Sequence, residues 1–209
     1  VDADSGTTHW HVFAIPLVSS HTAASLDGFC GGGCLLSAIK TQLGVFADAR
    51  SGRLEKQKAL LYLVHFAGDI HQPLHCAMDD SPVPLRKRFG NTKTVLWKGK
   101  PRQLHQFWDR MLLTGAEARK TDVHTLAREL ELDLAGRDTS SWLAGDFLRE
   151  AALESFQLAR EIIYPDFERS RGKISAKDHK AMSNLVKERL ERAGVRLAAW
   201  LETALGGIK

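Results

Sequence analysis

Residues 54–69 constrain the fold most, because their apolar side chains recur at the spacing of an α-helix. Gln72-Pro73 follows, and a proline ends or kinks a helix. The same pattern recurs in four later segments: residues 104–113, 123–134, 142–163 and 176–205. We expect Tyr164-Pro165 to stop the third of these segments and Gly206-Gly207 to cap the last.

Strand-like runs are scarce and are confined to residues 12–15 and 94–97. The second run precedes Lys98-Gly99-Lys100-Pro101, which has turn chemistry and predicts a small β-hairpin. Residues 76–103 otherwise read as a long irregular stretch. We therefore predict an all-α fold, mostly helical, with residues 1–209 forming a single domain. The longest apolar run, residues 59–64, is far shorter than the ~20 residues of a membrane helix, so we expect no stable membrane association.

Positive charge is concentrated in one stretch of the chain. The net charge is only +4, yet residues 81–108 contain no Asp or Glu. The stretch carries seven cations, namely Arg86, Lys87, Arg88, Lys93, Lys98, Lys100 and Arg102, and it also contains Phe89, Trp97, Phe107 and Trp108. Cations neutralise phosphates and aromatic rings stack on bases, so this mixture favours single-stranded nucleic acid. The alternative is a solvated loop whose aromatic residues fill the core.

The three cysteines are too few for a disulfide scaffold. Cys30 and Cys34 flank three glycines, which would let the backbone turn tightly enough to join the two sulfurs. A bridge over so short a loop would mainly fix the turn and would imply an oxidising compartment. Cys76 follows His75 directly and is either a metal ligand or, more commonly for such a residue, a buried thiol.

Histidine and aspartate recur at a spacing that suits metal binding. His65 and Asp69 are four residues apart, as are His105 and Asp109, so each pair projects from one face of a predicted helix. Imidazole nitrogens and carboxylate oxygens are the ligands of zinc sites that perform hydrolysis. With an upstream histidine and one just after the Pro73 break, the candidate ligands are His11, His65, Asp69, His75, His105 and Asp109. The alternative is a set of helix salt bridges and core histidines.

The block LVHFAGDIHQPLH, residues 63–75, resembles the signature of the zinc-dependent single-strand nucleases and 3′-nucleotidases, the mung-bean-nuclease family. Gly90-Asn91 followed by LHQFWD, residues 104–109, is similar to the next block of that family. Four further segments resemble its landmarks: Trp10-His11-Val12 before Pro16, residues 30–39, Glu154-Ser155 before Tyr164-Pro165, and residues 193–198. The resemblance runs from about His9 to the C-terminus.

This resemblance implies a mostly helical domain that holds three zinc ions. By motif position, His11, His65 and Asp69 would bind the first zinc, and His75, His105 and Asp109 the second. Asp69 would also reach toward the third zinc, as a metal-bridging catalytic residue, and Asn91 would line the nucleotide cleft. His71 falls at a variable position and is left out of the metal set. Four other histidines, His9, His21, His124 and His179, are expected to be surface or structural residues.

The chain departs from the family pattern near its beginning. In the family an N-terminal Trp and a nearby His bind the third zinc, and an upstream Asp completes the first site. No residue here is assigned to these roles, since Asp2 and Asp4 lie too close to His11. We therefore expect a member that lacks the family's N-terminal segment, with ligands for two zinc ions. Ala14 also replaces a carboxylate that the family often carries.

The function implied by the resemblance is a zinc-dependent phosphodiesterase. It would hydrolyse single-stranded DNA and RNA to 5′-phosphate products and also act on 3′-nucleotides. We expect a secreted or periplasmic monomer. Two alternatives stay open: a phosphodiesterase like zinc phospholipase C, which is a fold relative, and a non-catalytic member that binds zinc or nucleic acid.

Overall fold

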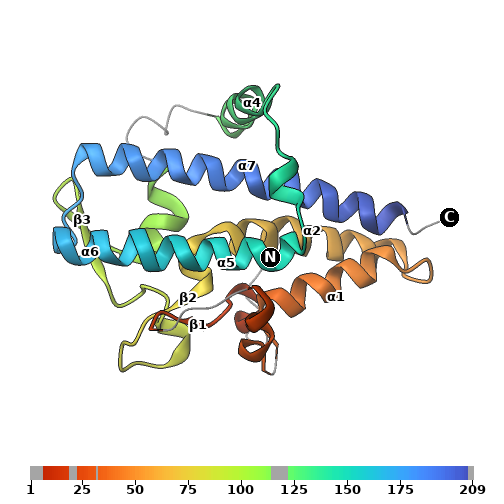
Figure 1. Cartoon of the computed structure of the whole chain (residues 1–209), viewed down its shortest axis with the longest axis horizontal. Coiled ribbons are helices and arrows are strands. Elements are labelled where there is room, and N and C mark those ends of the chain that lie inside the picture. Colours follow the sequence, from red (N-terminus) through yellow and green to blue (C-terminus); the bar gives the residue numbers. More distant parts are fainter. Residues whose placement is uncertain (1–6, 19–22, 32, 114–121, 207–209) are drawn as a thin grey trace.

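The computed structural model describes residues 7–18, 23–31, 33–113 and 122–206, and it is mostly helical (Figure 1). The helix α2 (Arg53–His71) packs against three other helices: α1 (Leu35–Ala47), α5 (Phe147–Leu158) and α7 (Ala176–Gly206). The predicted all-α fold is thereby confirmed. Within the described part of the chain, none of the helices combines the length and apolarity that a bilayer span requires.

The α2 helix forms for the reason that its sequence pattern indicates. Leu63, Phe66 and Ile70 repeat at helical spacing and are fully buried against the neighbouring helices. At its start, the Glu55 carboxylate accepts a hydrogen bond from the Gly52 backbone N–H at 2.7 Å, which caps the first turn. At its end, the chain turns at Gln72 into the short 3₁₀ helix η3 (Pro73–Cys76).

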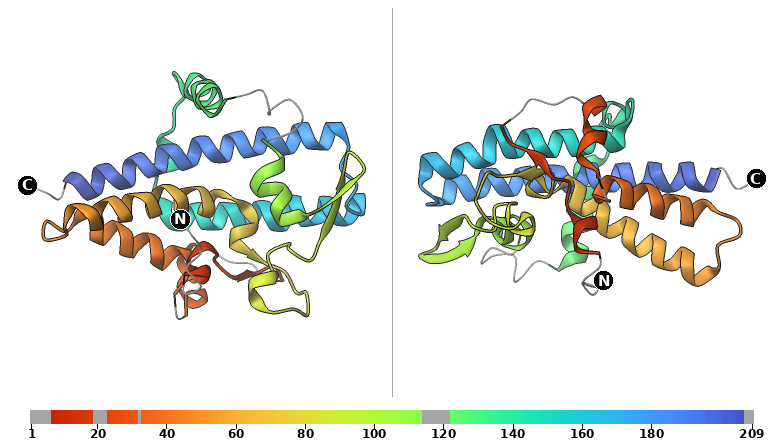
Figure 2. Two further views of the ribbon diagram at one scale, coloured as in Figure 1. Left: turned by 180° about the vertical axis from the view of Figure 1, so that it is seen from behind. Right: turned by 90° about the horizontal axis from the view of Figure 1, so that it is seen from below.

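The small strands are local supports for loops. β1 (Ile15–Pro16) pairs in parallel with β2 (Ala77–Met78). β3 (Thr94–Trp97) pairs antiparallel with β4 (Lys100–Gln103), which confirms the predicted hairpin. The turn residues Lys98 and Gly99 both have positive φ, +50° and +73°, as a two-residue turn of type I′ requires. Figure 2 shows this hairpin at one end of the molecule, beside the beginning of α7.

The strand expected over residues 12–15 is wrong except at Ile15. Residues 12–14 make isolated contacts instead of a ladder: Val12 O accepts from Leu35 N at 3.0 Å, and Phe13 N donates to His75 O at 2.7 Å.

The sequence pattern did not predict the α1 helix. It forms because Leu35, Leu36 and Ile39 are buried in the core, although Gly44 and β-branched residues weaken its intrinsic preference.

The helix predicted over residues 142–163 is interrupted and then extended. It consists of η6 (Ser140–Leu143), then α5, then a π-helical turn, η7 (Ala159–Ile163), which continues into α6 (Tyr164–Ser170). The expectation that Tyr164-Pro165 stops the helix is wrong. Pro165 is the second residue of α6, directly after the π-helical turn, and the helix continues past it.

Three other predicted helices are recovered with small differences. The final helix is α7, although Gly207 of its expected cap lies outside the described residues, and α4 (Val123–Leu134) matches its predicted range. The segment predicted as residues 104–113 is one turn of α3 (Leu104–Gln106) followed by a π-helix, η5 (Phe107–Met111). Figure 1 places α4 outside α7, away from the core.

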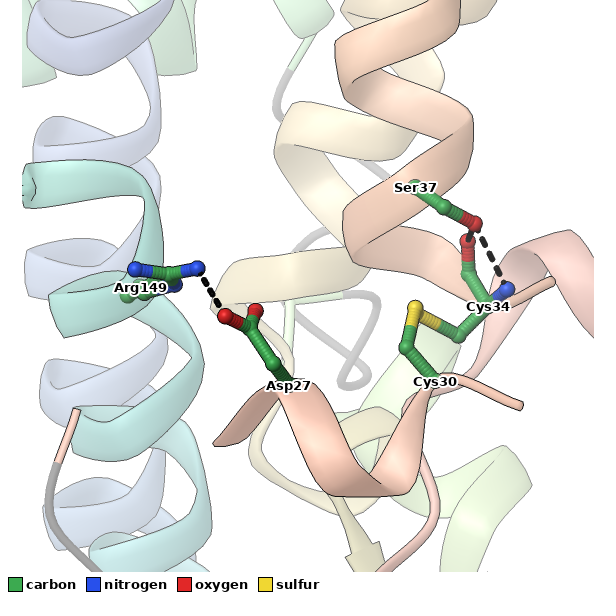
Figure 3. Close-up of a disulfide and its surroundings, with 5 residues drawn as sticks. All are labelled: Asp27, Cys30, Cys34, Ser37 and Arg149. Atoms are coloured by element: carbon green, nitrogen blue, oxygen red, sulfur yellow. Dashed lines mark hydrogen bonds and ion pairs between the residues drawn. A yellow bond between two sulfur atoms is a disulfide. The ribbon is translucent and has the colours of Figure 1, made fainter. Parts of the chain in front are cut away.

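Cys30 and Cys34 form the predicted disulfide just before α1 (Figure 3). It joins the 3₁₀ helix η2 (Ala23–Phe29) to α1, and an ion pair between Asp27 and Arg149 ties η2 to α5. The Ser37 hydroxyl accepts from Cys34 N and donates to Cys34 O, both at 2.8 Å. The bridge thus fixes the N-terminus of α1. The backbone N–H of Leu35, the first residue of this helix, donates to Val12 O.

Candidate metal centre

All six candidate ligands lie around the C-terminal end of α2. His11 ends the 3₁₀ helix η1 (Thr8–His11), and His65 and Asp69 share one face of α2. His75 comes from η3 just beyond the Pro73 break. Residues separated by up to 98 positions therefore meet at one place, in two groups: His11, His65 and Asp69, and His75, His105 and Asp109.

The ligand atoms of the first group converge closely. His11 Nδ1 lies 2.9 Å from Asp69 Oδ2 and 3.0 Å from His65 Nε2, and His65 Nε2 lies 3.3 Å from the same carboxylate oxygen. Ligand atoms at about 2.0–2.1 Å from a tetrahedral zinc lie roughly 3.3–3.4 Å apart, and shorter separations are expected for higher coordination numbers. The three atoms therefore fit around one ion with minor adjustment.

The second group has slightly wider spacing. His75 Nε2 lies 3.4 Å from Asp109 Oδ1, and His105 Nε2 lies 3.5 Å from Asp109 Oδ2. The rings of His75 and His105 stack with centroids 4.8 Å apart. Asp69 connects the two groups, because its other oxygen, Oδ1, is 3.6 Å from His75 Nδ1. One carboxylate thus faces both groups.

Backbone carbonyls fix the tautomers of the second-group histidines. His75 Nδ1 donates to His11 O at 2.5 Å, and His105 Nδ1 donates to Phe89 O at 2.7 Å. A carbonyl oxygen only accepts, so each ring carries a proton on Nδ1, and Nε2 is the nitrogen that faces Asp109. Metal-binding histidines are held by such outer hydrogen bonds.

The local charges keep both carboxyl groups ionised. Burial by itself raises the pKa of Asp69, but hydrogen bonds from His11 and His65 outweigh burial and lower the pKa from 3.8 to about 2. Burial also raises the pKa of Asp109, and its hydrogen bond with His75 together with the charge of His105 brings the net shift below the usual value. Ionised carboxylates are the form that binds a cation.

A buried aspartate supports the loop beside the second group. Asp79 accepts hydrogen bonds from the backbone N–H groups of Ser81 and Gly90, both at 3.0 Å, and from the Tyr164 hydroxyl at 3.3 Å. Gly90 has a φ of +77°, and it precedes Asn91. These bonds hold Phe89 O against His105, and Asn91, two positions after Phe89 in the chain, is half-buried. Sequence reasoning missed Asp79.

A cavity of about 690 Å³ opens beside both ligand groups. Its lining combines His11, His65, Asp69, His75 and Asp109 with apolar residues such as Trp108, Val186 and Leu190. Gln72 links the end of α2 to the candidate ligand Asp109. Its Nε2 donates to Asp109 Oδ1 at 2.7 Å, and its Oε1 accepts from Leu74 N. Sequence reasoning treated Gln72 only as a helix stop.

The remaining singled-out residues lie outside the two groups. Cys76 is a buried free thiol that belongs to neither ligand group; its Sγ–H donates to Ile70 O at 3.6 Å, and burial raises its pKa to about 12. His71 is buried against Arg196, His9 and His124 are exposed, and His179 stacks on Trp97. His21, Asp2 and Asp4 lie outside the described residues.

The structure buries most aromatic rings of residues 81–108 and leaves several of its cations exposed. Phe89, Phe107 and Trp108 are buried in the core, and Trp97 stacks on His179 at 4.2 Å between ring centroids. Phe89 and Phe107 are therefore unavailable for stacking on bases, and the core-filling alternative is the correct one for them, whereas the largely buried Trp108 also lines the cavity. The cations Arg86, Lys87, Lys98 and Lys100 are exposed.

Comparison with known proteins finds relatives that are named nucleases. It is 30% identical over 196 residues to Endonuclease 2 of Arabidopsis thaliana, covering 84% of this chain and 63% of that protein. It is 27% identical over 192 residues to Nuclease S1 of Aspergillus oryzae, covering 84% and 64%. Nuclease P1 of Penicillium citrinum is 25% identical over 193 residues, covering 85% and 69%.

The chain thus spans under two thirds of the length of the first two relatives. The family model described as S1/P1 Nuclease matches residues 2–206. That match takes in both ligand groups and every described helix, so the chain belongs to the S1/P1 nuclease family.

Proposed function

We propose that this chain is a zinc-dependent phosphodiesterase that cleaves single-stranded DNA and RNA to 5′-phosphate products and removes phosphate from 3′-nucleotides. The supporting observation is the pair of His–His–Asp groups joined through Asp69, beside a cavity of about 690 Å³. Family membership and the names of the relatives, all called nucleases, favour the same substrate class.

The donor set favours zinc, because nitrogen and carboxylate ligands with room left for water are typical of catalytic zinc. Bound zinc lowers the pKa of a coordinated water to about 7 and neutralises phosphoryl oxygens. In this proposal His11, His65 and Asp69 hold one ion and His75, His105 and Asp109 hold another. Asp69 orients both groups, and Asn91 hydrogen-bonds the phosphate or nucleotide.

A single strand is the proposed substrate because the target phosphate must reach ligands that line a cavity. A base stacked in a duplex must first be unstacked, which costs a few kcal/mol. The exposed cations Lys98 and Lys100 on the hairpin and Arg86 and Lys87 supply the long-range attraction to the phosphates. The disulfide supports an oxidising location, secreted or periplasmic, and we propose a monomer.

The first experiment measures hydrolysis of a single-stranded oligonucleotide with added zinc, and with a chelator as the paired control. Bound zinc is counted in the same samples. His65→Ala and Asp69→Asn should each lose zinc and activity together. His124→Ala, an exposed histidine on α4, is the matched control and should keep both. Release of phosphate from 3′-nucleotides but not from 5′-nucleotides tests the second activity.

The outcomes distinguish the proposed function from the two alternatives. Full zinc binding and a full rate in either ligand variant would refute the site assignment. Zinc binding without cleavage would indicate the non-catalytic alternative. Hydrolysis of phosphatidylcholine vesicles in preference to the oligonucleotide would indicate the phospholipase alternative.

A further inference from the structure

The last turn of α2, which carries Asp69, is hydrogen-bonded to two other helices. Ser155 Oγ on α5 donates to Ile70 O at 2.6 Å, and Arg189 Nε on α7 donates to His71 O at 3.1 Å. Carbonyl groups at the end of a helix have no intrahelical partner, so they depend on such donors. The turn that holds Asp69 is therefore fixed from outside α2.

His71 adds a second connection between this turn and α7. Its Nδ1 donates to Ala67 O at 2.8 Å, which leaves Nε2 as an acceptor. Arg196 Nη1 donates to that Nε2 at 3.0 Å, while Arg196 Nε donates to Trp142 O at 2.9 Å. His71 and Arg196 are 2% and 1% exposed, so this geometry is shielded from water.

Glu154 joins the two arginines into one unit. Its carboxylate accepts from Arg189 Nη1 at 2.6 Å and from Arg196 Nη2 at 2.7 Å. Arg189 Nη2 also donates to Ser155 Oγ at 3.0 Å, which orients the hydroxyl that holds Ile70. We call this set the α2 clamp: His71, Glu154, Ser155, Arg189 and Arg196.

We propose that the α2 clamp positions Asp69 and thereby sets the metal affinity of both ligand groups. This inference rests on the proposed metal centre. Asp69 is one residue before Ile70 and two before His71, the points that the clamp holds. Its two oxygens lie 2.9 Å from His11 and 3.6 Å from His75, so a small shift of this turn disturbs both groups. The clamp residues are positioning residues and touch no metal themselves.

The directional bonds distinguish this role from simple core packing. Buried ion pairs are often no more stabilising than apolar residues of similar volume. Hydrogen bonds, in contrast, fix a backbone carbonyl in distance and angle. Loss of comparable outer partners typically weakens metal binding by about 10–100-fold. The clamp also gives a role to Glu154, Ser155 and Arg196. These residues lie in segments that resemble landmarks of the family, but they are not among the metal ligands.

The test compares variants inside and outside the clamp. Ser155→Ala removes one hydroxyl oxygen, and Arg189→Met removes the bond to His71 O. The matched control is Arg149→Met, because Arg149 on α5 pairs with Asp27 and Asp146 rather than with a clamp residue or the end of α2. The apparent Kd for Zn²⁺ is measured against a chromogenic chelator, and the visible spectrum of the Co²⁺-loaded protein reports ligand geometry.

We expect both clamp variants to bind Zn²⁺ about 10–100-fold more weakly and to alter the Co²⁺ spectrum. Arg149→Met should stay within about twofold of the unmodified chain. Unchanged Zn²⁺ affinity and Co²⁺ spectrum in Ser155→Ala would overturn the inference, and this variant decides alone if Arg189→Met fails to fold. Equal weakening in Arg149→Met would also overturn it, since general destabilisation would then explain the effect. An unmodified chain that binds no zinc refutes the proposed metal centre instead.

Discussion

Replacing Glu154 with Gln should remove a contribution to the stability of this protein that depends on pH. The carboxylate lies among three guanidinium groups, those of Arg189, Arg192 and Arg196. Burial alone raises the pKa of Glu154, but the hydrogen bonds and charges of Arg196 and Arg189 outweigh it and lower the pKa from 4.5 to about 2. The folded state therefore favours the ionised form.

The magnitude follows from this difference in pKa. Each pKa unit is worth about 1.4 kcal/mol, so the ionised Glu154 contributes about 3 kcal/mol to the free energy of unfolding at pH 7. Because the folded-state pKa is the lower one, this contribution is complete above about pH 4.5 and is lost as the pH falls toward 2. At pH 3 about 1.4 kcal/mol should remain. A total stability of about 5–15 kcal/mol leaves the variant folded at neutral pH.

The assay is urea unfolding of the unmodified chain and Glu154→Gln from pH 7 to pH 3, with a chelator present throughout so that metal release does not contribute. Glutamine resembles the protonated glutamic acid, so the difference between the two proteins should shrink from about 3 kcal/mol to less than half as the pH falls. A difference that stays constant over this range would refute the electrostatic reasoning and assign the loss to packing.

Three further predictions address other parts of the molecule. Lys98→Ala with Lys100→Ala should reduce the slope of log affinity against log salt for a single-stranded oligonucleotide by about 1.4, since each phosphate contact contributes about 0.7; an unchanged slope would exclude the hairpin from binding. Tyr164→Phe removes the donor to Asp79 and should cost roughly 1–2 kcal/mol in urea unfolding, whereas no loss would show that this bond is dispensable. Reducing the Cys30–Cys34 disulfide should cost only about 2 kcal/mol in the same assay, because the closed loop is so short; a loss of 5 kcal/mol would contradict this.

The sequence alone determined the features that depend on local spacing. His65 and Asp69 share a face because four residues make about one helical turn, and His105 and Asp109 stay together even though their helix is partly π-helical. The hairpin turn Lys98-Gly99 and the Cys30–Cys34 disulfide are equally local. Each prediction needed only neighbours a few positions apart, where chain geometry leaves little choice.

The tertiary structure decided the features that depend on long-range packing. Pro165 continues a helix because a π-turn precedes it, and Phe89, Phe107 and Trp108 fill the core where the pattern also allowed base stacking. Motif resemblance assigned His11 to the site, but only packing brings its Nδ1 to 2.9 Å from Asp69, 58 residues away.

The support behind the ligands was likewise invisible in the sequence. The bonds from Gly90 N–H to the Asp79 carboxylate and from Arg189 to His71 O span 11 and 118 residues. A buried donor or acceptor must find a partner wherever the fold supplies one, and no local pattern specifies which residue that is. The chain's own spacing thus selected the ligands, whereas the packing of α5 and α7 against α2 fixed the positions that they occupy.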